Sequence, residues 1–400
     1  MAFYVRFVDN EIVSLLSLTV DGTLLSFKTE TDRKYFENFM NESFEMTSPG
    51  KQTIMSFLST RIVQSEHGIS LDQTYHIKNK ILNDWFPPNS TVKHVNTPID
   101  HTTDFEIKLG TTAAIKQHDL HTYEKLYHGE FRHSIGQLLH VQQWTRADIS
   151  YSVSRLATYN TSPNPVAFKT IRRIMQFLHT HPHQPLFYPR RKLGTSETIN
   201  YQWSPKESSS YTLPSLPVVF SDAAFANITP DRRSMEAHVF LLNGVAYAWS
   251  SNVQRATAKD STDAEIRSAF KTANAIVCHK NFLTSSSITC LLRKPMTLFL
   301  DSTATKKVIQ ANKVTSRTRH LDVPVNYTHE IYNNGYFQPE YVHRSLNLAD
   351  ALTKALPAQS FSRHWDIMRG LRFYPSKDTP HGKYLRDLTF SAITDFDETK

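Results

Sequence analysis

The chain has 400 residues, of which 40% are hydrophobic, and it carries a formal net charge of +8. This length and composition exclude a disordered chain and allow two or three packed domains. Only Cys278 and Cys290 are present and no apolar run approaches a membrane span, so the sequence predicts an intracellular soluble protein without a disulfide framework, and its basic charge favours a polyanionic partner.

The first segment is predicted to begin with a β-hairpin. Residues 12–28, IVSLLSLTVDGTLLSFK, form two β-prone runs on either side of Asp21-Gly22, and Asp-Gly between apolar runs is a strong turn signal. The elements expected after it are a helix over 31–45, strands over 53–63 and 67–72, and a helical segment over 73–86.

The middle of the chain is predicted to be helical. A polar stretch over 87–128 has few apolar clusters and is interpreted as a connector, whereas residues 129–180 show firm helical periodicity. Prolines and the serine run 208–210 then interrupt the pattern over 181–215. This interruption is the clearest domain boundary in the sequence.

The second half is predicted to be a mixed sheet covered by helices, because three strands are followed by alternating helices and strands. A tight Asn243-Gly244 turn joins the second and third strands. The elements expected here are strands at 218–226, 236–243 and 245–254, a long amphipathic helix at 262–284, a strand at 296–301, a helix near 304–312, a strand at 336–342 and a helix from 348.

Four acidic residues occupy similar places relative to these elements. Asp222 lies within an apolar strand, where a carboxylate is costly unless it is paired or bound to a metal. Glu265 is in the first turn of the long helix, Asp301 ends the strand MTLFLD, and Asp350 lies in the first turn of NLADALTKAL. If the four converge, they form an oxygen-rich site suited to Mg²⁺ or Mn²⁺, and two such ions could clamp a phosphodiester.

Three of these acids also have purely structural interpretations. Glu265 fits a capping box with Thr262 as the N-cap residue, and Asp350 could have the same role behind Asn347. Asp301 could simply mark the end of its strand. A capping role does not suit a residue inside an apolar strand, so Asp222 has no such alternative.

The segments VVFSDAAFA, LLNGVAYAW, STDAEIRSAF, MTLFLDSTAT, SRTRHLDV and NLADALTKALP occur in this order over about 218–357. In this order they resemble the ribonuclease H domain of copia-type LTR-retrotransposon Pol polyproteins. The resemblance implies an α/β, ribonuclease H-like fold with a mixed five-stranded sheet and flanking helices. It also implies that Asp222, Glu265, Asp301 and Asp350 are catalytic and bind two Mg²⁺ or Mn²⁺ ions.

Upstream segments extend the resemblance. YHGEFRHSIGQLLH and TRADISYSV are similar to the connection region of the same polyproteins, and residues 4–109 resemble the C-terminal part of a reverse-transcriptase palm and thumb. The front part is therefore expected to be α+β. The implied organisation is a partial palm and thumb at 1–110, a helical connection at 111–183, a linker at 184–215, a ribonuclease H-like domain at 216–357 and a tail at 358–400.

The polymerase site of that family is not reproduced. Its Y-V-D-D motif corresponds here to Thr19-Val20-Asp21-Gly22, so Gly22 removes one of the carboxylates that two-metal chemistry requires. The fingers and the earlier palm strand, which supply another carboxylate, would precede Met1. Polymerase activity is therefore predicted to be lost.

Several basic residues are candidates for nucleic-acid binding. Arg317, Arg319 and His320 correspond to basic positions of the family near the hybrid, and an equally good interpretation is structural. His343 precedes Asp350 by seven positions, near the place of a mobile histidine in many ribonucleases H, although the spacing differs and a structural role is favoured.

Two further groups have alternative interpretations. His179, His181 and His183 suggest a metal cluster, but their alternation beside prolines favours solvent exposure. The basic runs Arg172-Arg173 and 190–192 could contact phosphates of a duplex, and a solvated surface explains them equally well.

These observations leave two functional hypotheses. The first is a Pol fragment whose ribonuclease H domain hydrolyses the RNA strand of RNA–DNA hybrids, with a hybrid or template–primer duplex and the rest of a Pol polyprotein as partners. It would act in the cytoplasm or in virus-like particles, with nuclear access also open, and not at a membrane. The second is a catalytically silent remnant that binds nucleic acid or host proteins. Ala237-His238, Ile266 and Ser302 depart from the family pattern and suggest a degenerate copy, yet none of them replaces an acid.

Overall fold

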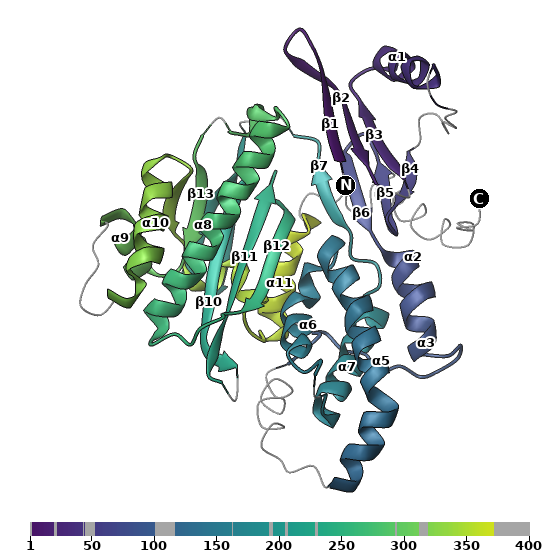
Figure 1. The fold of residues 1–400 in the computed structure, drawn as a ribbon, viewed down its shortest axis with the longest axis vertical. Helices are drawn as coiled ribbons and strands as arrows, with labels where there is room; N and C mark the ends of the chain where they lie inside the picture. The colour runs from purple at the N-terminus through teal and green to yellow at the C-terminus, as the bar shows by residue number, and fades with distance from the viewer. Residues whose placement is uncertain are drawn as a thin grey trace.

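Four sheets and the helices between them make up the described part of the chain, which is a mixed α/β structure (Figure 1). None of the described helices combines the length and hydropathy that spanning a bilayer requires. The computed structural model describes residues 2–19, 22–42, 44, 53–100, 117–161, 163–191, 195–204, 207–228, 231–292, 294–311 and 319–371, without the side chains of 117–129, 165, 196–212 and 214.

The N-terminal sheet contains the predicted hairpin. The strand pair nearest the turn is Leu18 with Thr23, which confirms the hairpin. Asp21 at the tip lies outside the described residues. A strand that the sequence did not predict pairs with the hairpin on its other side. The elements are β1 (Ala2–Val8), β2 (Glu11–Leu18), β3 (Thr23–Phe27) and α1 (Glu30–Asn41), which begins after the N-cap residue Thr29.

A second sheet joins residues that are far apart in the sequence. Its strands are β4 (Ile54–Phe57), β5 (Thr60–Gln64), β6 (Gly68–Asp72) and β7 (Leu186–Pro189), in that order. Strand β7 comes from the segment expected to be a linker and pairs antiparallel with β6. The same segment contains a second hairpin, β8 (Ser196–Ser204) and β9 (Glu207–Pro214), so residues 184–215 include three strands.

The helical middle of the chain forms the first hydrophobic core. In this core, Ile81 and Ile99 pack with Phe131 and Ile174, so the expected boundary at residue 110 does not coincide with the packing. The helical segment predicted at 73–86 is present and contains a π-helical turn. The elements are α2 (Thr74–His76), η1 (Ile77–Leu82), α3 (Asn83–Trp85), α5 (Gln117–Trp144), η2 (Ala147–Ile149), α6 (Ser150–Ala157) and α7 (Pro165–Thr180).

A five-stranded mixed sheet lies in the second half, as predicted. Its strand order is β12-β11-β10-β13-β14, with antiparallel pairing among the first three strands and parallel pairing from β10 through β13 to β14. At the predicted turn, Asn243 and Gly244 have φ angles of 56° and 77°, the left-handed region that Asn-Gly turns require. The strands are β10 (Val218–Ile228), β11 (Arg233–Leu242), β12 (Val245–Val253), β13 (Met296–Leu300) and β14 (Phe337–Tyr341).

Helices cover both faces of this sheet (Figure 1). Because side chains alternate along a strand, Val219 packs towards α8 and its neighbour Phe220 packs towards Trp365 on the opposite face. Trp365 belongs to α11, so the segment predicted as a tail begins with a helix in the core. The helices are α8 (Ser261–Ser285), η3 (Thr289–Leu292), α9 (Thr303–Ala311), η4 (Arg319–Leu321), α10 (Asp322–Asn333), η5 (Arg344–Leu346), η6 (Leu348–Leu352) and α11 (Ala358–Met368).

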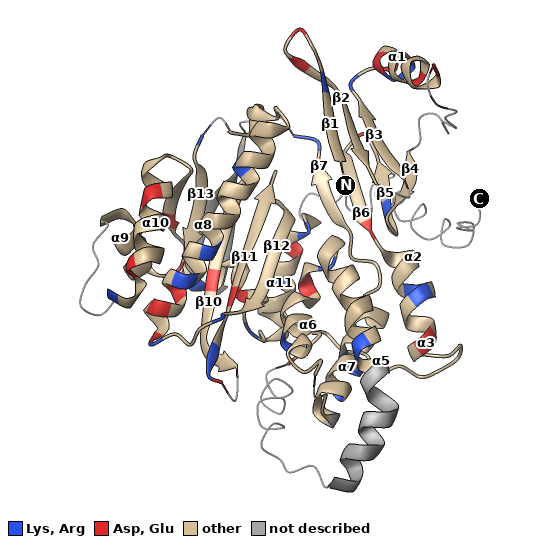
Figure 2. Ribbon diagram, viewed as in Figure 1, with Lys and Arg blue, Asp and Glu red and all other residues tan. Residues whose placement is uncertain are grey.

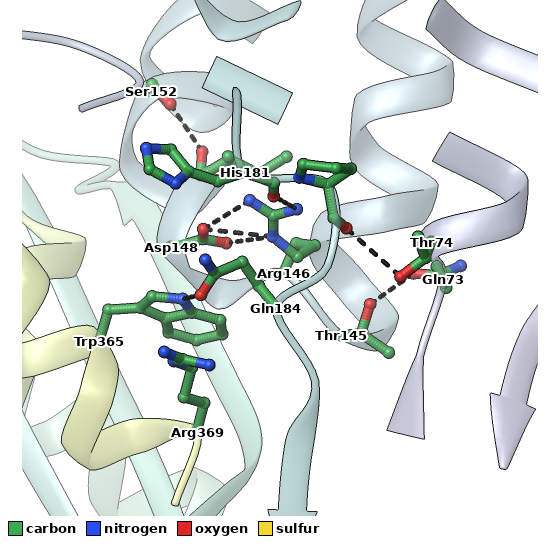
Figure 3. A network of polar contacts seen from close by, with 12 residues as sticks. Gln73, Thr74, Thr145, Arg146, Asp148, Ser152, His181, Gln184, Trp365 and Arg369 are labelled. Atoms are coloured by element: carbon green, nitrogen blue, oxygen red, sulfur yellow. Dashed lines mark hydrogen bonds and ion pairs between the residues drawn. The ribbon is translucent and has the colours of Figure 1, made fainter. Parts of the chain in front are cut away.

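A buried ion pair between Arg146 and Asp148 lies between η2 and the end of α7 (Figure 3). The guanidinium of Arg146 donates to both oxygens of Asp148, at 2.8–3.2 Å, and the two side chains are 1% and 0% exposed. Arg146 also donates to the backbone oxygen of His181, 3.0 Å away. A buried charge is tolerated only with such partners, so this pair fixes η2 against the end of α7.

Hydrogen bonds around this pair connect it to the front and to the C-terminal helix (Figure 3). Thr145 donates to Gln73, which directly follows β6, at 2.9 Å. The Trp365 indole donates to Gln184, which precedes β7, at 3.0 Å. The Trp249 indole of β12 donates to the backbone of Gln142 in α5 at 2.8 Å. The five-stranded sheet is therefore held against the helical region by partly buried polar contacts as well as by apolar packing.

Candidate metal centre

Two of the four acids are brought together by strand register. Asp222 is on β10, 1% exposed, and Asp301 directly follows β13. The two strands are parallel, and Phe220 pairs with Phe299, so continuing the register by two residues places Asp301 beside Asp222. Neighbouring strands are about 4.8 Å apart, which brings the carboxylates within reach of one metal ion.

Asp350 reaches the same place from the 3₁₀ helix η6. Asn347 is its N-cap residue, accepting from the backbone of Ala349, and its amide donates to the backbone oxygen of Ser221 at 2.9 Å. This buried amide fixes η6 against β10, one residue before Asp222. Oxygen atoms of Asp222, Asp301 and Asp350 all lie within 4.8 Å of one another.

Glu265 borders this group of three from α8. The charges of Asp222 and Asp301 act on its carboxylate and raise its pKa. Its Oε2 atom is buried and has no hydrogen-bond partner in the described part of the chain. The structural interpretation of Glu265 is not supported, because the N-cap residue of α8 is Asp260 and not Thr262.

The site is strongly electronegative, as the pKa values of its acids show. Burial and, next, the charge of Asp222 raise the pKa of Asp301 to about 6 and the pKa of Asp350 to about 8. The pKa of Glu265 is raised well above its usual value by burial and by the same charge. Three carboxylates therefore resist ionisation where they crowd together without a divalent ion. Figure 2 shows red on β10, whose one acidic residue is Asp222, and blue on the adjacent α8, which contains Arg267, Lys271 and Lys280.

Two residues at this site were missed by the sequence analysis. The Thr353 hydroxyl donates to Oδ2 of Asp222, and the Lys354 ammonium donates to Oδ1 of Asp350 at 2.7 Å. Burial lowers the pKa of Lys354, but the charges of Asp222 and Asp350 outweigh burial and raise it above its usual value. The available signal was the spacing of Asp350 and Lys354, which is that of a helical ion pair.

The donor set fits a hard divalent metal ion. Mg²⁺ and Mn²⁺ prefer carboxylate oxygens, and this site presents three within a small space and a fourth with a buried oxygen that lacks a partner. Among the described residues, no other group of three or more His, Cys, Asp or Glu side chains is arranged to hold an ion. Asp222, Asp301 and Asp350, with Glu265 beside them, are thus the candidate metal ligands.

Several of the known proteins to which the chain is similar are retrotransposon polyproteins, although a secreted RxLR effector protein of Plasmopara viticola also matches over 132 residues. The chain is 22% identical over 361 residues, 90% of its length, to the retrovirus-related Pol polyprotein from transposon TNT 1-94 of Nicotiana tabacum. It is 25% identical over 243 residues to the Pol polyprotein from transposon RE2 of Arabidopsis thaliana, and 26% identical over 207 residues to the Ty1-JR2 Gag-Pol polyprotein of Saccharomyces cerevisiae. The chain is related to retrotransposon Pol polyproteins.

The relation covers much of this chain and a small part of its relatives. The alignments span 24% of the Nicotiana polyprotein, 15% of the Arabidopsis polyprotein and 12% of the yeast polyprotein, and they include 60% and 49% of this chain in the last two cases. No family model matches the chain. What is shown is similarity to a part of these Pol polyproteins, and the activity of this chain is a separate question.

The candidate nucleic-acid contacts of this Pol-related chain are dispersed. His320 Nε2 is 2.8 Å from the buried carboxylate of Asp263 in the first turn of α8, so His320 joins η4 to α8. Arg319 is exposed beside it, and Arg317 lies outside the described residues. His343 is exposed and is the N-cap residue of η5. Whether these residues contact nucleic acid stays a prediction.

The three alternating histidines do not form a metal cluster. His179 is exposed and packs edge-on against Phe86, whereas His181 packs against Phe177. His183 Nδ1 is 3.1 Å from the Thr74 hydroxyl, and burial lowers the pKa of this histidine. The expected solvent exposure therefore applies to His179 and not to the other two.

The two basic runs differ in their surroundings. Arg173 is paired with Asp100 at 2.8 Å, whereas Arg172 is exposed over the ring of Phe86. The third residue of the run 190–192 lies outside the described residues. A role of either run in phosphate binding stays a prediction.

Proposed function

We propose that this Pol-derived fragment is a ribonuclease H that hydrolyses the RNA strand of RNA–DNA hybrids and that it has no polymerase activity. The observation that carries the proposal is the meeting of Asp222, Asp301 and Asp350 within 4.8 Å, with Glu265 bordering them. The strand order, three antiparallel strands followed by two parallel ones with α8 on one face, supports a ribonuclease H-like arrangement.

The catalytic roles follow from where the carboxylates lie. Asp222, Glu265 and Asp301 would hold one divalent ion, and Asp222 with Asp350 would hold a second. Bound there, two such ions supply a nucleophile at neutral pH and stabilise charge on the leaving oxygen. The chain's own contribution is to hold the carboxylates in register: Asn347 fixes η6 on β10, and Ser268 donates to the backbone oxygen of Asp222 at 2.7 Å.

The proposed reaction adds water to a phosphorus atom of the RNA strand and breaks its bond to the 3′ oxygen. The products are a 3′-hydroxyl end and a 5′-phosphate end.

A groove supports the binding of a polyanion here, since residues 355–358, which directly follow Lys354, line it on one side. It is also lined by Lys93 and His94, which suit phosphate contacts, and by Arg173 together with its ion-pair partner Asp100.

The loss of polymerase activity rests on the first hairpin. Gly22 follows the tip and has no carboxylate, where the polymerase motif of the family has its second aspartate. Two-metal nucleotide transfer needs a cluster of acids. Within the described residues, no such cluster is found near β2 and β3.

Cleavage of a hybrid tests the proposal. The purified chain is incubated with a labelled RNA–DNA hybrid, with single-stranded RNA, or with RNA duplex, in Mg²⁺ or in EDTA. We expect cleavage of the hybrid alone, only with Mg²⁺. Asp222→Asn should abolish it, whereas Asp231→Asn, at a half-exposed aspartate paired with Arg233, should retain it. Hybrid binding without cleavage by the wild-type chain would refute the proposal and favour a silent nucleic-acid-binding remnant.

A further inference from the structure

Lys354 places an ammonium group among the carboxylates of the candidate metal centre. Its Nζ atom is 2.7 Å from Oδ1 of Asp350, whose side chain is 7% exposed, and the charges of Asp222 and Asp301 also act on it. The lysine side chain is 33% exposed. The ammonium thus neutralises part of a cluster of four acids that would otherwise repel one another.

The position of this ammonium conflicts with full use of Asp350 as a metal ligand. Asp222, Asp301 and Asp350 lie within 4.8 Å of one another, and Nζ is in hydrogen-bond contact with one of them. Two cations at such short range repel, most strongly where water is largely excluded. A divalent ion held by Asp350 and the ammonium seen here therefore compete for the same negative charge.

We propose that Lys354 is a built-in competitor of the metal: its ammonium neutralises the acids until a divalent ion displaces it from Asp350. The inference rests on the proposed function, because it takes these acids to be metal ligands. The lysine is suited to this role by its flexible four-carbon stem and partial exposure, which let the ammonium move towards water while the backbone stays fixed.

Two consequences distinguish competition from a purely structural ion pair. A variant that lacks the ammonium should bind divalent ions more tightly, because no cation has to leave. The same variant should be less stable without metal. The crowded carboxylates then lose the ammonium that hydrogen-bonds to Asp350, and their mutual repulsion is no longer offset. A structural pair would give the loss of stability without the gain in affinity.

Manganese binding measures both consequences without any assay of cleavage. Mn²⁺ is titrated into the full chain and free Mn²⁺ is followed by electron paramagnetic resonance, which counts bound ions and gives their affinities. We expect Lys354→Met to bind its weaker Mn²⁺ at least about tenfold tighter than wild type, which corresponds to about 1.4 kcal/mol. In EDTA the same variant should unfold at a lower urea concentration, and Mn²⁺ should reverse the difference.

Two control variants test whether the effect depends on a positive charge and on its position beside Asp350. Lys354→Arg keeps a cation beside Asp350 and should bind Mn²⁺ like wild type. Lys306→Met removes a lysine of similar exposure that pairs with Glu340 of β14 at 3.0 Å, and it too should bind like wild type. Lys354→Gln, which keeps a hydrogen bond and loses the charge, provides the same comparison if Lys354→Met does not fold.

The outcomes separate this inference from the proposed function. If Lys354→Met and Lys354→Gln bind Mn²⁺ no more tightly than wild type, competition is refuted while the metal centre remains. If neither wild type nor the variants bind Mn²⁺, the metal centre and the inference fail together.

Discussion

Replacing Asp222 by asparagine should stabilise the metal-free protein, although it removes a buried charged group. Asp222 repels its three acidic neighbours and attracts Lys354. Oxygen atoms of Asp222, Asp301 and Asp350 lie within 4.8 Å of one another. At an effective dielectric constant of about 20, one fully ionised pair at that distance repels by about 3.5 kcal/mol.

The net effect follows from counting these interactions at a pH where the acids are ionised. At pH 9, above the pKa of about 8 for Asp350, Asp222 has two ionised aspartates within 4.8 Å and one ammonium to offset them, and Glu265, which is outside that group of three, is left out of the count. Roughly one uncompensated repulsion remains, so we expect Asp222→Asn to raise the free energy of unfolding by about 2–3 kcal/mol. The asparagine oxygen can still accept the hydrogen bond from Thr353.

Asp148 provides a matched control with the opposite sign. As a whole residue it is 2% exposed, against 1% for Asp222, but its neighbour is the buried guanidinium of Arg146. Removing one partner of such a pair costs about 3–5 kcal/mol, so Asp148→Asn should destabilise the protein by that amount. The assay is urea unfolding in EDTA, followed by tryptophan fluorescence. An Asp222→Asn protein less stable than wild type would show that Asp222 is a structural hydrogen-bond acceptor.

Three other results are expected. The metal-free chain should lose stability as the pH rises from about 4 to about 8, because the pKa of Asp350 is raised from 3.8 to about 8 and only the folded protein keeps this proton in that range; urea unfolding should show a shallower slope in Asp350→Asn than in wild type. Asn347→Ala should lower the free energy of unfolding by about 1–3 kcal/mol, because the backbone oxygen of Ser221 loses its buried donor, and equal midpoints in urea would contradict this. Gly22→Asp should extend no primer on any template, and extension would overturn the proposed loss of polymerase activity.

The arrangement of Asp222 and Asp301 could be predicted because it depends on strands alone. Each carboxylate lies on or directly after a strand that the sequence indicates, and the parallel pairing of β10 with β13, which the resemblance to a ribonuclease H domain implies, brings the two together. The Asn243-Gly244 turn could also be predicted from the sequence, since few other residue pairs adopt the positive φ angles that it requires. The part of the site built on regular strands was therefore open to prediction.

The rest of the site and fold depended on contacts between distant segments. Lys354 and Asp350 have a spacing that usually marks an exposed helical pair, and only the docking of η6 on β10 brings the lysine to the acids. Strand β7 was missed because its four residues end in proline, and its pairing with β6 joins segments more than 100 residues apart. Local sequence patterns contain no signal for such pairings.

Helix α11 sets a minimum length for the open reading frame. Phe361 packs into the core of the helical region, whereas Trp365 and Met368 pack into the core behind the five-stranded sheet. A stop codon just after Lys354 would leave all four candidate metal ligands encoded. It would still delete the side chains of α11 that join the two cores. Nonsense and frameshift mutations as far as residue 368 should therefore inactivate the product. A degenerating copy of the gene can thus lose the folded site although the codons for its four acidic residues are unchanged.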